Sequence, residues 1–237
     1  MSETLPAFLR DTLPSLDQGL FGRLRRDSGP EWTAYVRHPF VRRLGAGILD
    51  LADFKRFLVQ DYLYLLQYAR ASAMAIVKAD ALEDMRSAAS TVSGLVLTEL
   101  GLHLGYCREW GLDEAELEAT PATLETLAYG GFIMDRAHAG DLLDLTVALA
   151  ACLAGYAEVG LTLRHDPATV RDGNPYWSWI ETYSGEVYTG LAEAGIKRLN
   201  ALSERRGGEA RYPMLLRDFR TTVRLEAGFW SGAMREG

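Results

Sequence analysis

The 237-residue sequence has few cysteines and histidines, and their scarcity excludes several kinds of site. The two cysteines, Cys107 and Cys152, both lie in apolar runs with helical spacing, so we expect free thiols in a reducing, cytoplasmic environment rather than a disulfide. The four histidines fall mostly near the ends of predicted helices. A di-iron site needs several histidine ligands, and this sequence does not supply them.

Other signals are absent as well. No stretch alternates apolar and polar residues as a half-buried strand does, and the chain has no repeat, phosphate-binding glycine loop or Ser-His-Asp candidate. Its 25 basic residues are scattered among 32 acidic ones, a net charge of −7, which argues against a nucleic-acid partner. The N-terminus lacks the basic start and apolar core of a signal peptide, and we expect no apolar run of membrane-spanning length. These absences predict a soluble all-α protein.

The chain is long enough for one large domain, and no linker divides it. We predict an irregular N-terminal arm at residues 1–16 and a single helical domain at 17–237. Apolar residues at helical spacing and cap residues predict helices at about 18–27, 30–38, 51–78, 82–110, 121–136, 142–163, 175–203 and 213–234. Residues 166–175 form a turn-rich segment, and His38, which precedes a proline, is expected in a loop or a cap.

The most apolar of these helices, at 142–163, carries Cys152 near its middle. Its main stripe alternates steps of three and four, and its other faces are mostly Ala, Val and Leu. A helix that is apolar nearly all round is typical of the centre of a domain, so we expect Cys152 to be buried. A buried free cysteine often only fills space, and this helix alone leaves its role open.

Residues 51–78 place one carboxylate, Asp61, within an aromatic stripe. The other members of that face are Phe54, Phe57, Tyr64 and Tyr68. A buried acid must be hydrogen-bonded, paired or neutralised, and Tyr64 is an available donor about one turn later. A structural pair that joins two helices and a functional acid are both consistent with this pattern.

Glu99, His103 and Cys107 follow one another at i, i+4 and i+8 and therefore share a helix face. Such a set is able to bind a metal ion, but it is short of ligands. We therefore favour a helix-packing trio. In the next predicted helix, Tyr129 is followed by Gly130 and Gly131, which allow close packing beside it.

Three long helices each carry one reactive polar side chain partway along an apolar stripe: Asp61, Cys152 and Glu226. They lie very roughly 15 to 22 Å from their helix starts, so all three are able to reach one layer of a helical bundle. A nucleophile and two acids in an apolar layer form a catalytic arrangement, in which one acid delivers a proton and the other holds a polar substrate. No His or Lys close in sequence explains how the Cys152 thiolate is generated.

Four segments resemble the TenA family, also called thiaminase II: HPFVRRLGAGILDLADFKRFLVQDYLYL, ALAACLAGYAEVGLTLRHDP, YWSWIETYSGEVY and LEAGFW. The resemblance covers about residues 18–235 and favours the branch that carries the cysteine. It implies a haem-oxygenase-like helical bundle, commonly a homotetramer. It also implies a hydrolase of thiamin salvage that converts 4-amino-5-aminomethyl-2-methylpyrimidine to the hydroxymethyl-pyrimidine with release of ammonia, and that also cleaves thiamin. This chemistry requires neither a cofactor nor a metal.

The resemblance also implies roles for single residues. Cys152 is then the nucleophile, Glu226 the acid and base, and Asp61 the residue that holds the aminopyrimidine ring. The remaining pocket residues that it implies are Tyr64, Tyr129, Tyr156, Tyr183 and Phe229. The sequence departs from the family in its proline-containing arm and its longer 166–175 turn, which bear on substrate access and oligomer contacts.

Other functions remain open at this point. One is a non-catalytic aminopyrimidine-binding or regulatory protein, and another is a haem-oxygenase-like oxidase of the same fold. The quinone synthase of this fold must neutralise a polyanionic substrate, whereas residues 142–163 include no basic side chain. Turnover of an aminopyrimidine distinguishes the hydrolase from the binding protein.

Overall fold

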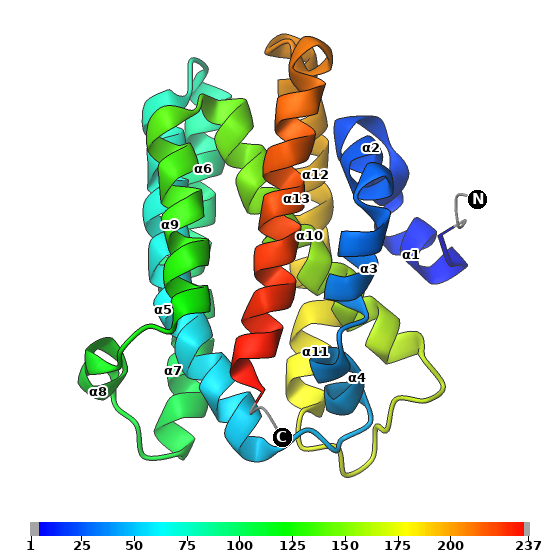
Figure 1. Ribbon diagram of the computed structural model, residues 1–237, viewed down its shortest axis with the longest axis vertical. Coiled ribbons are helices and arrows are strands. Elements are labelled where there is room, and N and C mark those ends of the chain that lie inside the picture. Colours follow the sequence, from blue (N-terminus) through cyan, green and yellow to red (C-terminus); the bar gives the residue numbers. More distant parts are fainter. Residues whose placement is uncertain (1–4, 235–237) are drawn as a thin grey trace. The chain divides into compact units, whose positions relative to one another are not determined.

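The computed structural model describes residues 5–234, and every regular element in that range is helical (Figure 1). The predicted all-α fold class is therefore confirmed. The elements are α1 (Ala7–Thr12), the 3-10 turn η1 (Pro14–Asp17), α2 (Gly19–Asp27), α3 (Gly29–Val36), α4 (Pro39–Gly45), α5 (Leu51–Lys78), α6 (Leu82–Gly94), the π-helix η2 (Leu95–Glu99), α7 (Leu100–Glu109), α8 (Glu114–Ala119), α9 (Leu124–Ala139), α10 (Leu142–His165), α11 (Trp177–Ser184), α12 (Glu186–Arg205) and α13 (Gly208–Ala233).

Backbone contacts group the chain into two compact units. The first unit contains the residues up to Leu49 together with Val147–Ala227. The second contains Asp50–Thr146 and the residues from Gly228 onward. The division into an arm at 1–16 and one domain at 17–237 stays a prediction.

Helix α5 is the centre of the second unit, where it packs against α6, α7, α8 and α9 (Figure 1). It has the bounds that the sequence predicts, because its ends are marked by local chemistry. The Asp50 side chain accepts a hydrogen bond from the Ala52 amide at 2.7 Å, which caps the first turn. At the other end, the Lys78 ammonium donates to the Gly140 carbonyl at 2.6 Å and ties α5 to the end of α9.

In the first unit, side chains of α12 hold the N-terminal segment. Asn200 accepts a hydrogen bond from the Phe21 amide at 2.9 Å and donates to the Gln18 carbonyl at 3.2 Å. Two turns earlier, Glu193 accepts a hydrogen bond from the Ser15 hydroxyl at 2.7 Å. These contacts attach η1 and α2 to α12.

The predicted irregular arm is therefore wrong from residue 7 onward, where α1 and η1 form. Leu9, Leu13 and Leu16 are each at most 1% exposed, because the short apolar patch between the two prolines finds apolar neighbours to cover it. Residues 1–4 of that arm lie outside the described residues.

Several predicted helix bounds also need correction. The predicted helix at 82–110 is interrupted by η2, and the predicted helix at 175–203 is divided at Gly185 into α11 and α12. Helix α13 begins at Gly208 and contains Pro213, so the proline does not mark its start. The prediction for His38 is confirmed, since its Nδ1 accepts a hydrogen bond from the Phe40 amide at 3.2 Å and caps α4.

Helix α10 is long and apolar enough to cross a membrane by length and composition, so the expectation that no apolar run reaches that length is wrong. Its most apolar window is, however, 78% buried. A helix with apolar side chains on all faces is also typical of the buried centre of a folded unit.

Helix α10 approaches α11 closely at Gly160. A β-carbon at this position would lie 2.5 Å from the carbonyl carbon of Tyr183 and 2.7 Å from the amide nitrogen of Ser184. Both atoms belong to the backbone and cannot rotate away. A residue without a side chain is therefore needed to bring Tyr183 against α10.

We expect Gly160→Ala to lower the free energy of unfolding by roughly 1–3 kcal/mol, because the added methyl group overpacks this contact. Gly190→Ala in α12 is the matched control, since a β-carbon there meets no atom within 4 Å. The control should raise the free energy of unfolding by about 0.5–1 kcal/mol through helix propensity. Urea denaturation measures both, and a Gly160→Ala variant as stable as the wild type would contradict the assignment.

Candidate active site

The eight predicted site residues belong to both units. Those of the first unit are Cys152, Tyr156, Tyr183 and Glu226, and those of the second are Asp61, Tyr64, Tyr129 and Phe229. Within each unit the structure establishes which of them meet. The common layer predicted for Asp61, Cys152 and Glu226 stays a prediction.

Cys152 is half-buried, so the prediction of a buried thiol is wrong. Its neighbours Ala151 and Ala154 are fully buried, whereas Leu149 and Leu153 are partly exposed as it is. Positions 149, 152 and 153 share one face of α10, and this face is not completely covered by other side chains. Apolar composition predicted burial on all sides, but this face of α10 is only partly covered.

Aromatic rings gather one turn beyond Cys152. The rings of Tyr156 on α10 and Tyr183 on α11 have centroids 5.0 Å apart, and Trp179 lies 4.5 Å from Tyr183. All three residues are buried. The structure therefore brings together two tyrosines that the family resemblance implies for the pocket, and Trp179 lies beside them.

Glu226 lies on α13 and is 2% exposed, in agreement with its predicted core-facing position. The fully buried Thr222 precedes it by one turn, and its hydroxyl donates to the Asp218 carbonyl at 3.0 Å. Glu226 is thus a buried residue on a regular helical turn of α13.

Helix α10 also carries a buried acid, Glu158, which was not among the predicted site residues. Its carboxylate accepts two hydrogen bonds from Arg25, at 2.9 and 2.8 Å, and one from the Trp32 indole at 3.0 Å. The premise that each long helix holds one reactive polar side chain is therefore wrong. The signal in the sequence was a charged residue within a strongly apolar run, which requires a buried partner. Because those partners come from α2 and α3, we assign Glu158 a structural role.

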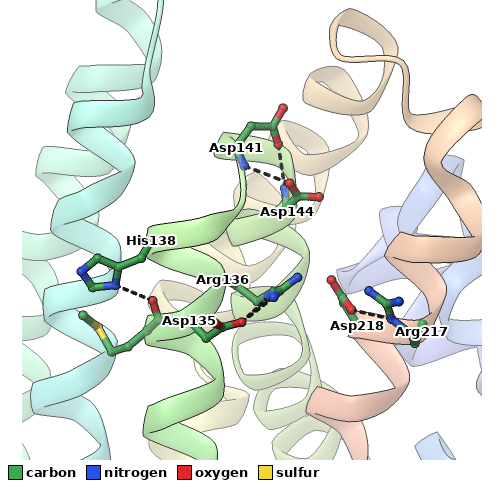
Figure 2. Close-up of polar contacts among 8 residues, drawn as sticks. Asp135, Arg136, His138, Asp141, Asp144, Arg217 and Asp218 are labelled. Atoms are coloured by element: carbon green, nitrogen blue, oxygen red, sulfur yellow. Dashed lines mark hydrogen bonds and ion pairs between the residues drawn. The ribbon is translucent and has the colours of Figure 1, made fainter.

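Two further buried acids also have local partners (Figure 2). Asp144 accepts a hydrogen bond from the Asp141 amide at 2.9 Å at the start of α10, and Asp218 lies 3.1 Å from the Arg217 guanidinium. His138, near the end of α9, pairs with the Met134 carbonyl at 2.7 Å. The Asp144 and His138 contacts lie near helix ends, whereas Asp218 is buried within α13 beside an arginine whose side chain is largely exposed.

In the second unit, the partner of Asp61 is His103. The His103 Nε2 atom lies 2.7 Å from Asp61 Oδ2, and both side chains are at most 5% exposed. The other ring nitrogen, Nδ1, lies 3.0 Å from the backbone oxygen of Glu99. His103 therefore does more than complete a packing trio with Glu99 and Cys107, because it pairs the buried acid of the neighbouring helix. Among residues 5–234, no cluster of three or more His, Cys, Asp or Glu side chains suits a metal ion.

This pairing determines the charge state of the histidine. Burial by itself lowers the pKa of His103, but the hydrogen bond and charge of Asp61, with a smaller contribution from Glu99, outweigh it. The pKa of His103 is therefore raised above its ordinary value of 6.5. The imidazolium form is favoured where it faces the carboxylate.

The remaining residues of the second unit form an aromatic group. The rings of Tyr64 on α5 and Tyr129 on α9 stack with their centroids 4.3 Å apart, and Phe229 lies 5.9 Å from Tyr64. Close packing beside Tyr129 is also observed, since a β-carbon at Gly130 would lie 3.0 Å from the Gln67 side chain. Aromatic faces of this kind suit a flat heterocyclic ligand.

The second cysteine differs from Cys152 in its surroundings. Cys107 is fully buried, and burial raises the pKa of its thiol. A raised pKa reduces the thiolate fraction at neutral pH, and the thiolate is the reactive form. Of the two cysteines, Cys152 is therefore the less buried one.

The His103 pKa gives a stability prediction. We expect Asp61→Asn to lower the free energy of unfolding most near pH 6 and progressively less at higher pH. A histidine with a raised folded-state pKa contributes its full stabilisation below pH 6.5 and loses it as the pH rises through the raised value.

The matched control is Asp53→Asn on the same helix, whose carboxylate lies 3.3 Å from the Arg56 guanidinium. An arginine does not titrate in this range, so the effect of the control should not change with pH. Urea denaturation from pH 6 to 9 measures both differences. Equal pH profiles for the two variants would show that His103 is not coupled to Asp61.

The sequence matches the model of the TENA/THI-4/PQQC family over residues 26–236. Aminopyrimidine aminohydrolases of Halalkalibacterium halodurans and Bacillus subtilis are 35% and 30% identical to it, over 87% and 86% of this chain and 92% and 85% of theirs. A crystal structure described as a TenA family transcription regulator from Silicibacter sp. TM1040 is 38% identical, with a TM-score of 0.86, over 92% of this chain and 98% of that one. These matches confirm the predicted resemblance and the haem-oxygenase-like fold class.

Proposed function

The chain belongs to the TENA/THI-4/PQQC family, and on this basis we propose that it is an aminopyrimidine aminohydrolase of thiamin salvage. The proposed reaction is hydrolysis of a C–N bond, which converts 4-amino-5-aminomethyl-2-methylpyrimidine to the hydroxymethyl-pyrimidine and releases ammonia. Relatives that bear this name over most of both chains support it. The observation that carries the proposal is that Cys152 is only half-buried, on a helix whose other apolar side chains are mostly buried.

Substrate recognition is proposed to rest on charge and on flat apolar surfaces. The Asp61 carboxylate, paired with His103, accepts a hydrogen bond from the amino group of the pyrimidine. The stacked rings of Tyr64 and Tyr129 and the nearby Phe229 offer aromatic faces to the ring. Tyr156 and Tyr183, one turn beyond the thiol, complete the set that the family resemblance implies.

The proposed chemistry is nucleophilic. The Cys152 thiolate adds to an electron-poor ring carbon and forms a C–S bond, which interrupts the aromatic system. Glu226 protonates the ring or the leaving group, the C–N bond breaks, and ammonia departs with the bonding electrons. Water then adds to the exocyclic methylene, Glu226 accepts its proton, and expulsion of the thiolate restores the ring. Thiamin would follow the same path with its thiazole as the leaving group, as a poorer substrate.

A regulatory protein that binds an aminopyrimidine without turnover is the second candidate. The structural relative described as a transcription regulator is the observation that favours it. The experiment that separates the two is ammonia release from the aminomethyl-pyrimidine, assayed beside thiamin cleavage. A folded chain that binds the pyrimidine but releases no ammonia would support the regulator.

The two cysteines provide a matched pair of variants. We expect Cys152→Ser to retain its fold and bind the aminopyrimidine but lose roughly 1,000-fold or more in turnover, because an alcohol is a far poorer nucleophile than a thiolate. Cys107→Ser should keep a nearly intact rate at a modest cost in stability. Ammonia release and thermal melts with and without ligand measure both. A dead Cys107 variant beside an active Cys152 variant would overturn the mechanism.

We further propose a cytoplasmic homotetramer, the assembly that the family resemblance implies. Its support is a set of exposed apolar side chains on α5, α7, α9 and η2 of the second unit, namely Val77, Leu97, Leu102, Leu124 and Leu127. Exposed apolar side chains that gather on one surface mark sites of association, and an oligomer would cover them. We expect light scattering at micromolar concentration to give about four times the chain mass of 26.2 kDa. A monomer would refute the proposal.

A further inference from the structure

The hydrogen-bond geometry of His103 identifies where its protons lie. A backbone carbonyl only accepts, so the 3.0 Å contact of Nδ1 with the Glu99 oxygen requires a proton on Nδ1. The 2.7 Å contact between Nε2 and Asp61 Oδ2 requires a second proton between those two atoms. Both ring nitrogens are therefore engaged, and the imidazole cannot turn without losing a hydrogen bond.

The position of His103 on its helix depends on an irregularity in the preceding turn. The π-helix η2 directly precedes α7, and both pack against α5. A π turn holds one more residue than an α turn, which rotates the following side chains by about 100° relative to an uninterrupted helix. Because His103 follows this turn by four residues and bonds to its last carbonyl, η2 sets the face on which the imidazole meets Asp61.

The contact engages only one side of the carboxylate. Oδ2 receives the hydrogen bond from His103, and among the described residues no hydrogen bond to Oδ1 accompanies it. An ion pair that served only to neutralise a buried charge would be most stable with both oxygens satisfied. The second oxygen is the part of Asp61 that remains to accept a hydrogen bond from a ligand.

We propose that His103 is a positioning residue for substrate recognition, which fixes Asp61 through Oδ2 so that Oδ1 accepts a hydrogen bond from the ring amino group of an aminopyrimidine. This inference rests on the proposed function. The positioned carboxylate would distinguish a 4-amino from a 4-oxo pyrimidine. It accepts a hydrogen bond from an amino group but repels a carbonyl oxygen at the same ring position. The 4-oxo analogue of the product is therefore the informative competitor.

Two substitutions of His103 separate its two contacts. In His103→Asn, the shorter amide occupies the place of Nδ1 and reaches the Glu99 carbonyl but not Asp61. In His103→Gln, the longer amide occupies the place of Nε2 and still donates to Asp61. The control Thr126→Val removes another buried hydrogen bond of the same unit, the 2.7 Å contact of the Thr126 hydroxyl with Gln60, and leaves Asp61 untouched.

The measurements are calorimetric binding of 4-amino-5-hydroxymethyl-2-methylpyrimidine and of its 4-oxo analogue, with steady-state ammonia release from the aminomethyl substrate. We expect His103→Asn to bind the amino ring roughly 10- to 100-fold more weakly, with a similar rise in KM and little change in kcat. Its preference for the amino over the 4-oxo ring should fall by a similar factor. His103→Gln should recover most of the affinity, and Thr126→Val should bind as the wild type does.

The outcomes separate this inference from the function on which it rests. If the wild type binds and turns over the aminopyrimidine and His103→Asn retains wild-type affinity and ring preference, the positioning role is overturned while the function stands. Equal losses in His103→Asn and His103→Gln would also overturn it, because only one of these variants retains the contact with Asp61. A wild-type chain that neither binds nor converts the pyrimidine would overturn both.

Discussion

A polar or charged side chain that is removed from water needs a partner, and this constraint determines how the helices of each unit pair. Asp61 on α5 is met by His103 of α7, and Glu158 on α10 is met by Arg25 of α2. Gln60, next to Asp61, accepts a hydrogen bond from Thr126 of α9. Removing one partner of a buried ion pair typically costs about 3–5 kcal/mol, so each pair defines one register between two helices and penalises the others.

Buried polar groups of this protein therefore fall into two kinds. Glu158 has hydrogen bonds to both carboxylate oxygens and holds the first unit together. Asp61 has one oxygen paired, and Cys152 lies on a face of α10 that neighbouring side chains cover only partly. A carboxylate oxygen without a hydrogen bond and a side chain that is only partly buried are typical of residues that meet a ligand. Here they occur at residues that the family resemblance assigns to catalysis and binding.

Local features of the fold could be predicted from the sequence, and contacts between distant segments could not. Asp50 predicts the start of α5 because a cap acts within one turn, and the spacing of apolar residues predicts the core of α10. The break at Gly185 and the π-helix before α7 interrupt segments that the spacing of apolar residues predicts as single helices. Gly160 shows this dependence directly, since the atoms that require a glycine there belong to Tyr183 and Ser184.

The same distinction applies to the candidate site. The sequence identified Asp61 as a buried acid but proposed a partner from its own helix, whereas the observed partner is 42 residues away. The sequence likewise predicted a buried Cys152, whereas the residue is half-buried. Composition shows that a helix face is apolar, but it does not show which side chains of other helices cover that face. The roles of Cys152 and Glu226 came from the family resemblance, since periodicity alone does not distinguish a nucleophile from a filler.

In the proposed reaction, this chain hydrolyses the C–N bond of an aminomethyl-pyrimidine, and the hydroxyl oxygen of the product comes from water. The most direct test is conversion of 4-amino-5-aminomethyl-2-methylpyrimidine in water enriched in oxygen-18, followed by mass spectrometry of the pyrimidine product. Hydrolysis by this route should give a hydroxymethyl-pyrimidine that carries one oxygen-18 atom, formed in equal amount with ammonia. Unchanged substrate after incubation with folded protein would contradict it.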